Sequence, residues 1–324
     1  MTTATPIETI LFATDFSTCA AQAYEYALRM ASVSKATVHI LHVLEFQPGM
    51  DPEFPVNRLY LDQLRKETGE QFAALEPQAR RLNLRIMEHQ KMGIPSREIV
   101  EAARQFDVNL IVLGTHGRTG IEHVLLGSTA ERVIKSAPCP VLAVRDSGVP
   151  PARTTDKDAP AIAIERILAP IDFSDCSLDA LEYAAQTARQ FKAKVTIVHV
   201  MEPVAYGLDF TLAQPRGQDR QERLSARLSE LASALKGCGL EADYALRGGL
   251  PAETILNAER AGASDLIVMG THGRRGFSHF VSGSVAEAVL RRARCPVLAV
   301  RSPKFGSGHR RLVSLGGGKE TNVS

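Results

Sequence analysis

The stretch Gly114-Thr-His116-Gly117-Arg118 occurs a second time in this chain, as Gly270-Thr-His272-Gly273-Arg274. Each copy ends a hydrophobic run and is followed by a Gly-Ser pair, Gly127-Ser128 in the first case and Gly283-Ser284 in the second. Both copies therefore read G-x2-G-x9-G-S. Glycines allow the backbone to approach another group closely, and the N–H groups at a helix start attract anions. The pattern predicts a phosphate-binding loop in duplicate.

The repetition extends over most of the chain. Matching positions lie 156 or 157 residues apart: Asp15 and Asp172, His42-Val43 and His199-Val200, Gly93 and Gly249, and Cys139-Pro-Val-Leu-Ala-Val-Arg145 with 295–301. A period this long indicates two domains, and half of 324 residues is an ordinary domain size. We predict a first domain over residues 1–146, a linker over 147–163, a second domain over 164–302 and a mobile tail over 303–324.

Short apolar runs in each half are typical of buried strands. In the first half they are Thr9–Ala13, Thr37–Val43 and Val108–Leu113. Continuous apolar runs of this length fit strands that are buried on both faces of a parallel sheet. Helical patterns separate them, so the sequence predicts an α/β fold with a doubly wound sheet in each half.

The helical patterns have recognisable starts and apolar stripes. Ser17 is predicted to start one helix, and Ser96 and Ser128 are predicted to be the N-caps of two others. Two longer stripes run through matching places in the halves: Leu64, Thr68, Phe72, Leu75, Ala79 and Leu82, and then Leu224, Leu228, Leu231 and Leu235. The Pro- and Gly-containing stretches 46–57 and 203–220, which precede these stripes, are predicted loops.

Composition excludes several classes of protein. The apolar content of 44% and charged content of 23% are close to those of an average globular protein. A net charge of +2 is too small for the dense basic face of a nucleic-acid-binding protein. No apolar stretch is long enough to span a bilayer, and the N-terminus lacks a signal-peptide pattern. We therefore expect a cytoplasmic protein without a nucleic-acid or membrane partner.

The five cysteines include no C-x-x-C pair. This spacing favours neither a zinc site nor a thioredoxin-type redox site, and we interpret the cysteines as buried thiols. A redox role for Cys19 or Cys176 stays as the alternative.

The conspicuous residues follow the predicted strands. Asp15 ends the first strand, Val43 the second and Gly114 the fourth. A sheet of order 3-2-1-4-5 would bring these three positions to one crevice, because ligands bind where the strand order reverses. Sequence pattern alone leaves that order open.

Residue chemistry then suggests a nucleotide. Asp15 can accept hydrogen bonds from ribose hydroxyls or a base, and the backbone of Val43 can bind an adenine edge. The glycine loop and the helix that begins at Ser128 suit a polyphosphate. A P-loop is excluded, because Gly318-Lys319 is followed by Glu320, and the first strand is not followed by a G-x-G-x-x-G fingerprint.

On these motifs the chain resembles the universal stress proteins of the UspA type, in tandem form, over residues 6–145 and 164–301. The resemblance implies an adenine-nucleotide alpha-hydrolase-like, Rossmann-like fold: two tandem doubly wound domains, each with a five-stranded parallel sheet of order 3-2-1-4-5. It also implies binding of ATP or ADP, with Mg²⁺ as a further candidate, by proteins with the G-x2-G-x9-G-[S/T] motif. Both loops are intact, so we expect two sites.

The resemblance implies site residues by position. The first site would contain Ala13, Thr14, Asp15, Val43, Leu113, Gly114, His116, Gly117, Gly127, Ser128 and Thr129. The second would contain Pro170, Ile171, Asp172, Val200, Met269, Gly270, His272, Gly273, Gly283, Ser284 and Val285. The family often has Pro-Thr before the aspartate, and each half keeps one of the two residues, Thr14 or Pro170. Ile171 therefore cannot make the polar contacts of a threonine.

Several of these residues also have structural explanations. Asp15 and Asp172 can serve as helix N-caps as well as ligands. His116 and His272 can contact phosphate or donate to a backbone carbonyl. A metal site that also used His123 and His279 is not expected, since no acidic or cysteine ligands match them. His42 and His199 are predicted to be core histidines with satisfied hydrogen bonds.

The predicted function is regulation of a stress response through nucleotide-dependent conformation or partner binding, with at most weak ATP hydrolysis, since no catalytic base is evident. The alternatives are an adenylating enzyme of a related α/β fold and a nucleotide-free interaction module. The apolar final strands, 139–145 and 295–301, are predicted to pair edge to edge as an intramolecular pseudo-dimer. A further homodimer of chains is left open.

Overall fold

A computed structural model describes residues 7–45, 54–116, 126–146, 162–202, 214–271 and 284–301. Across these residues, each half of the chain contributes five strands and four helices. The ten strands form one sheet of order β3-β2-β1-β4-β5-β10-β9-β6-β7-β8. Each half thus has the order 3-2-1-4-5, and the prediction of two doubly wound α/β units is confirmed.

The elements alternate along the chain as the apolar runs predict. In the first half they are β1 (Thr9–Thr14), α1 (Thr18–Ser34), β2 (Thr37–Leu44), α2 (Pro55–Arg81), β3 (Ile86–Met92), α3 (Pro95–Gln105), β4 (Leu110–Gly114), α4 (Ser128–Ser136) and β5 (Val141–Val144). In the second half they are β6 (Arg166–Pro170), α5 (Asp175–Phe191), β7 (Lys194–Met201), α6 (Gln214–Gly237), β8 (Ala242–Gly248), α7 (Pro251–Gly262), β9 (Leu266–Gly270), α8 (Ser284–Arg292) and β10 (Val297–Val300).

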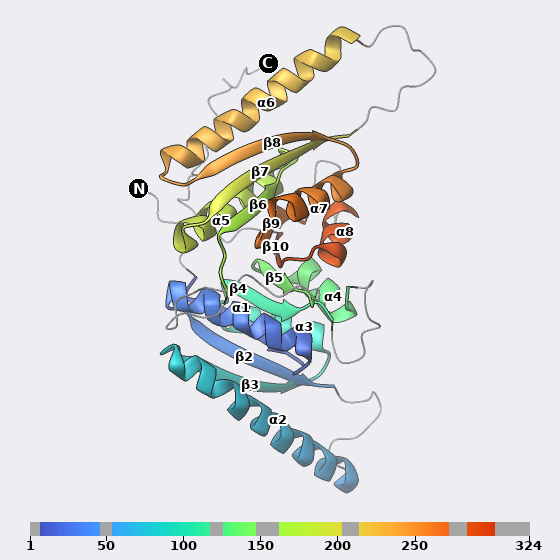
Figure 1. Ribbon diagram of the computed structural model, residues 1–324. Coiled ribbons are helices and arrows are strands. Elements are labelled where there is room, and N and C mark those ends of the chain that lie inside the picture. The colour runs from blue at the N-terminus through green and yellow to red at the C-terminus, as the bar shows by residue number, and fades with distance from the viewer. Residues whose placement is uncertain are drawn as a thin grey trace, which may run out of the picture.

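The two halves meet at their last strands. β5 and β10 pair antiparallel, with Leu142 opposite Leu298, whereas the other strand pairs are parallel. The halves are therefore stacked end to end along one sheet, and α2 and α6 lie at its opposite ends (Figure 1). The pairing leaves neither of these two apolar strands as an open edge.

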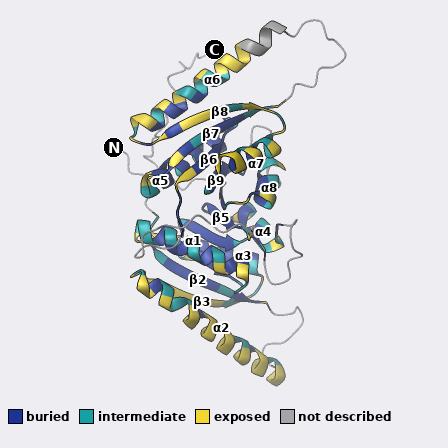
Figure 2. Ribbon diagram, in the orientation of Figure 1, coloured by how far each residue is buried: buried dark blue, intermediate teal, exposed yellow. Residues whose placement is uncertain are grey.

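Helices cover both faces of the sheet. On one face, α1, α2, α5 and α6 enclose a core cluster that includes Phe12, Tyr24 and Phe72. On the other face, α3, α4, α7 and α8 enclose a second cluster that includes Leu113 and Met269. The central strands are buried on both sides, and exposed residues gather on the outer surfaces of the helices (Figure 2). None of the helices in the described ranges is long and apolar enough to cross a membrane.

Polar and cationic contacts reinforce the junction between the halves. The guanidinium of Arg145, which follows β5, donates a hydrogen bond to the carbonyl of Arg291 in the last turn of α8. The guanidinium of Arg29 on α1 lies 5.1 Å from the ring centre of Phe191 on α5. A cation at a helix C-terminus and a cation over an aromatic face are both favourable placements.

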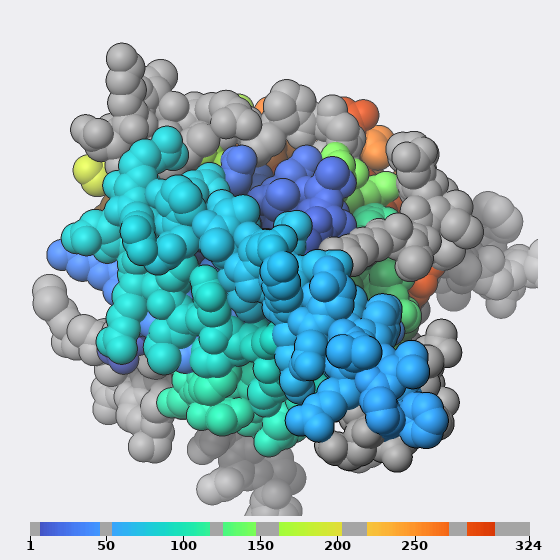
Figure 3. Space-filling view, turned by 90° about the horizontal axis from the view of Figure 1, so that it is seen from below, coloured from blue at the N-terminus to red at the C-terminus, as the bar shows by residue number. Residues whose placement is uncertain are grey.

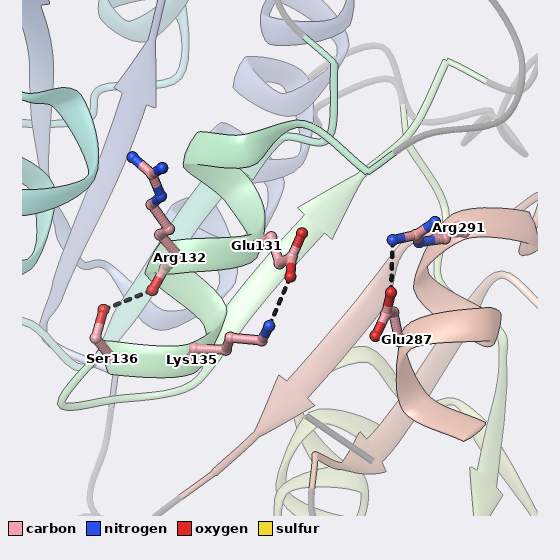
Figure 4. Close-up of polar contacts among 6 residues, drawn as sticks. All are labelled: Glu131, Arg132, Lys135, Ser136, Glu287 and Arg291. Carbon is pink, nitrogen blue, oxygen red and sulfur yellow. Dashed lines mark hydrogen bonds and ion pairs between the residues drawn. The ribbon is translucent and has the colours of Figure 1, made fainter. Parts of the chain in front are cut away.

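The helices α4 and α8 carry matching ion pairs near this junction. Lys135 lies 2.6 Å from Glu131, and Arg291 lies 2.5 Å from Glu287 (Figure 4). Both are i,i+4 pairs on partly exposed side chains, so each stabilises its own helix by about 0.3–0.5 kcal/mol. They also neutralise a carboxylate that lies in the first turn of each helix.

Several predicted boundaries are wrong, and proline explains most of them. The N-cap of α3 is Ile94 and not Ser96, because Pro95 occupies the first helical position. α2 begins at Pro55 and α6 at Gln214, inside the stretches 46–57 and 203–220 that we predicted as loops. Proline has its φ preset for the first turn of a helix, so it marks a helix start as readily as a loop.

Other expectations fall outside the described residues. These are most of the predicted linker, residues 147–161, and the predicted tail, residues 303–324. Where the description resumes, Ile162 and Ile164 are buried in the core cluster on the α1 and α5 face.

A pair of histidines on the α3 face of the sheet is specific to the first half. Nδ1 of His39 on β2 lies 3.0 Å from Nε2 of His89 on β3, and the rings are stacked at 7°. Phe106 packs against both rings. Burial, and for His39 the neighbouring His89, lower the pKa of both imidazoles below the ordinary value. The second half has Thr196 and Ala245 at the matching positions.

The pair predicts a specific loss of stability in acid. The folded-state pKa values of both histidines lie below the ordinary value of 6.5. Between these values the unfolded chain therefore binds more protons than the folded chain. The contribution of the pair to the free energy of unfolding is complete above pH 6.5. It is lost as the pH falls from 6.5 toward the folded-state pKa values. We expect the variant His39→Thr/His89→Ala to lose less stability than the wild type between pH 7.5 and 5.5 in urea denaturation. Equal losses would contradict this explanation.

Candidate functional site

The carboxyl ends of β1, β2 and β4 lie side by side, as predicted. β1 pairs with β2 on one side and with β4 on the other, both in parallel. The last β1 pair joins Thr14 to His42, so Val43 and Leu44 extend beyond the end of β1. The edge of β2 that faces β1 therefore presents backbone at this point without a strand beside it. The second half repeats this geometry, because the β6–β7 ladder ends at Pro170 opposite Val198.

The turn after β1 is organised by the aspartate. An oxygen of Asp15 accepts a hydrogen bond from the backbone N–H of Ser17 at 3.0 Å, and Asp172 accepts one from Ser174 at 3.0 Å. The alternative explanation, that the aspartates are themselves N-caps, does not hold, since Ser17 and Ser174 are the N-caps of α1 and α5. Each aspartate instead holds the turn that precedes the cap.

A histidine on the neighbouring strand fixes the start of the same turn. Nδ1 of His42 lies 2.8 Å from the carbonyl oxygen of Thr14, and Nδ1 of His199 lies 2.8 Å from that of Ile171. A carbonyl oxygen can only accept, so Nδ1 carries the proton in both rings. The prediction that these histidines are satisfied within the fold is confirmed.

The residue after each aspartate adopts an unusual backbone conformation. Phe16 has φ 59° and Phe173 has φ 62°, in the left-handed region that non-glycine residues rarely adopt. Such a conformation costs about 1–2 kcal/mol. Ring contacts offset this cost, since Phe16 lies 4.7 Å from the His42 ring and Phe173 lies 4.9 Å from the His199 ring. The same imidazole thus holds both sides of the turn.

Packing inside the protein explains why the first residue of each loop is glycine. A Cβ at Gly114 would come within 3.0 Å of Sγ of Cys19, and one at Gly270 within 2.9 Å of Sγ of Cys176. Both cysteines lie in the first turn of the helix that follows the aspartate turn. The glycines therefore allow α1 and α5 to pack closely on the ends of β4 and β9. We had predicted glycine for a loop around a ligand, and helix packing is a separate requirement.

The end of the first glycine loop, at Gly127, returns to the end of β4. The N–H of Gly127 donates to the carbonyl of Thr115 at 2.8 Å, and the N–H of Thr115 donates to Val144 at 2.8 Å. These bonds hold the start of α4 beside the end of β4. A Cβ at Gly127 would lie 2.9 Å from the Thr115 oxygen, so this close return requires glycine.

The helix α4 starts without a side-chain cap. Its N-cap is Gly127 and not Ser128, which is the first helical residue and is exposed. Glycine has no side chain to accept from the first N–H groups, whereas α1 and α5 are capped by serine oxygens. The start of α4 therefore leaves backbone donors for an acceptor outside the helix.

Many residues of the predicted sites can contribute only their backbone. The side chains of Ala13, Leu113 and Met269 are buried in the core cluster under α3, α4, α7 and α8, with Val43 beside them. Pro170 and Ile171 are also buried, while Val200, Thr129 and Val285 are half-buried and Ser284 is exposed. Nδ1 of His116 lies 2.8 Å from the hydroxyl of Thr115. Gly117, His272, Gly273 and Gly283 lie outside the described residues.

The halves differ beside the aspartate. The Thr14 hydroxyl accepts a hydrogen bond from the N–H of Phe16 at 2.9 Å, and its counterpart Ile171 has no such acceptor. Phe16 packs edge-on against Phe72 at 5.6 Å, whereas the guanidinium of Arg227 lies 4.3 Å from the ring centre of Phe173. The two sites therefore share one backbone plan with different surroundings.

Neither a metal cluster nor a disulfide is found in the described part of the chain. No group of three or more potential ligands gathers there, and His123 and His279 lie outside it. None of the five cysteines, which all lie in the described ranges, forms a disulfide, and those of α1 and α5 donate to the carbonyls of Val144 and Val300, each at 3.2 Å.

Comparison with known proteins agrees with the duplicated architecture. The chain matches the universal stress protein family over residues 6–145 and again over 163–301. It belongs to the universal stress protein family.

Relatives of this family match one half or the whole chain. Universal stress protein MJ0531 of Methanocaldococcus jannaschii is 36% identical over 137 residues, which cover 42% of this chain and 81% of the relative. Slr1230 of Synechocystis is 25% identical over 321 residues, which cover 91% of this chain and all of the relative. A universal stress protein structure from Archaeoglobus fulgidus shares the fold with a TM-score of 0.68 at 20% identity, covering 90% of this chain and 98% of that one.

Sequence reasoning missed the two phenylalanines and the role of the two cysteines. Both were visible in the repeat, since Asp15-Phe-Ser17 returns as Asp172-Phe-Ser174, and Cys19 returns as Cys176. Their function as supports of the turn depends on contacts with β2 and β4, which no local pattern specifies.

The glycine contacts predict opposite effects of alanine at two sites. Gly270→Ala places a Cβ within 3.0 Å of the Cys176 backbone and should destabilise the protein by about 1–3 kcal/mol. Gly69→Ala, inside α2, meets nothing within 4 Å and should stabilise it by about 0.5–1 kcal/mol. Urea denaturation of both variants measures this, and a neutral Gly270→Ala would show that helix packing does not require the glycine.

Proposed function

We propose that this member of the universal stress protein family binds ATP or ADP at two sites, one at the carboxyl edge of each half-sheet. The observation that carries the proposal is the meeting of three elements in the first half: the Asp15 turn, the β2 backbone beyond the end of β1, and the uncapped start of α4. The second half has the same turn and the same strand overhang.

The chemistry of these elements fits an adenine nucleotide. A carboxylate can accept several hydrogen bonds, so the Asp15 side chain can hold the turn and still accept from ribose hydroxyls. The peptide groups of Val43 supply a donor and an acceptor of the kind that an adenine edge requires. N–H groups and the positive end of the α4 dipole favour phosphate, and Mg²⁺ would arrive with the nucleotide.

The ion pairs of α4 and α8 are consistent with an anion at these helix starts. Glu131 lies in the first turn of α4, where an unpaired carboxylate would repel phosphate. Its pairing with Lys135 reduces that repulsion, and Arg291 does the same for Glu287.

We propose a regulatory role in a stress response and not a catalytic one, apart from at most slow hydrolysis. The aspartate of each turn accepts from the backbone N–H two residues further on, and the imidazole of His42 donates from Nδ1 to a carbonyl and packs against Phe16, so these groups have a structural role in the turn. Binding of the nucleotide would change how α1 and the glycine loop pack against the ends of the strands, and partner proteins would respond to that change. The pairing of the two halves through β5 and β10 in solution and a cytoplasmic location are parts of the same proposal.

Conservative substitution of the aspartates tests the two sites. Asn keeps the oxygen that accepts from Ser17 or Ser174, but its amide cannot accept from a ribose hydroxyl on the other side. Loss of a hydrogen bond to a charged group is worth about 1.5–3 kcal/mol, or about 10- to 150-fold in affinity. Calorimetry should find two ATP per wild-type chain, and Asp15→Asn or Asp172→Asn should weaken one binding event each.

The matched control is Asp62→Asn, which removes an exposed carboxylate of α2 that pairs with Arg65 at the surface. It should leave ATP affinity unchanged. Wild-type affinity at both sites of an Asp15→Asn/Asp172→Asn protein would place the nucleotide elsewhere. A wild-type protein that binds neither ATP nor ADP would favour the nucleotide-free interaction module.

A further inference from the structure

A cavity of about 120 Å³ lies behind the Asp15 turn, between α1 and α2. Its inner wall is formed by Phe12 of β1 and by Ala20 and Tyr24 of α1, and Leu75 of α2 closes the opposite side. The side toward the turn is formed by Thr14, Phe16 and Ser17. Figure 3 shows the neighbouring surfaces, where α2 lies across the outer face of the first half beside the dark blue atoms of the N-terminal region.

The cavity has a mouth at the surface of the molecule. Ala21 of α1 and Gln71 of α2 also line it, and both residues are exposed. Phe12 and Tyr24, which form its floor, are almost fully buried and pack against each other at 5.1 Å. A small molecule can therefore enter between the two helices without opening of the core.

The lining is uncharged, and the hydroxyl groups in it already have partners. The Tyr24 hydroxyl donates to the carbonyl of Leu75 at 3.0 Å, and burial raises its pKa, so it stays neutral. The Thr14 hydroxyl accepts from Phe16, and the Ser17 hydroxyl accepts from Ala20. Such walls favour an apolar occupant, because an ion or a strongly polar group would lose its hydration without replacement.

The second half has larger residues at the two positions that line the mouth in the first half. Leu178 occupies the position of Ala21 and is 6% exposed, so its side chain is packed into the core. Arg227 occupies the position of Gln71, and its guanidinium lies over the ring of Phe173. The two residues that line the mouth in the first half are thus replaced by larger ones, and Arg227 lies over the residue that follows Asp172.

We propose that the first-half cavity is a binding site for a small, uncharged, apolar molecule of about the size of a single aromatic ring. Apolar cavities of about 150 Å³ accept benzene or xenon, and this cavity is only slightly smaller and open at one side. The occupant contacts Phe16, the left-handed residue directly after Asp15. The site therefore adjoins the turn of the first half, and in the second half Leu178 and Arg227 stand at the positions of its mouth residues.

Titration of the full chain with benzene, followed by backbone amide NMR, tests the inference without any nucleotide. Saturable shifts are expected at Phe16, Ala20 and Gln71, and none at the counterparts Phe173, Ser177 and Arg227. Acetate, a charged probe of similar size, should cause no saturable shift in either half. Absence of saturable benzene shifts in the first half, or equal shifts in both halves, would overturn the proposal.

Two substitutions that exchange the halves sharpen the test. Ala21→Leu introduces the second-half residue at an exposed helix position and should weaken benzene binding at least tenfold. Leu178→Ala changes the matching position in the second half and should leave binding in the first half unchanged. Wild-type benzene affinity in the Ala21→Leu protein would show that the occupant lies elsewhere.

Discussion

The hydrogen bond between the imidazole of His42 and the carbonyl of Thr14 fixes the turn after β1, and the geometry of the candidate site in the first half depends on that turn. The bond ties the end of β1 to β2 at the point where the chain turns into α1 and beside the place where the sheet order reverses. Phe16 rests on the same imidazole, so the strained turn and the strand end share one support. Cys19, one turn later, sets how closely α1 lies on β4, and it also donates to β5. The position of Asp15 follows from these contacts before any ligand is considered.

Comparison of the two halves shows which features of this backbone arrangement are retained and which vary. Both halves keep the aspartate, the left-handed phenylalanine, the histidine bond and the close contact between cysteine and glycine. They differ in the residues that surround the turn, such as Phe72 against Arg227. Because both halves fold on the same register, the backbone plan tolerates these changes, and each half can acquire its own binding properties beside an identical turn.

The apolar runs and the long repeat predicted the strands of both halves, but they left the sheet order open. The family resemblance implied the order 3-2-1-4-5, and with it the meeting of Asp15, Val43 and Gly114. The sequence did not predict the helix starts at Pro55 and Pro95, since proline fits loops and first helical turns equally well. It also missed the His39–His89 pair, which lies on adjacent strands 50 residues apart. Such contacts depend on register between strands, and a sequence pattern specifies register only through burial.

The glycine motif does not by itself establish a binding site, because packing within the protein also requires these glycines. Gly114 and Gly270 are required by the cysteines of α1 and α5, and Gly127 is required by the return of the loop to Thr115. A chain that had lost its ligand would keep all three for packing alone. The uncapped start of α4 is different, because a serine or aspartate N-cap in place of glycine would supply an internal acceptor to the first N–H groups. Gly127 excludes that side chain by its contact with the Thr115 oxygen, so the tight return of the loop is also what leaves these donors to an external anion.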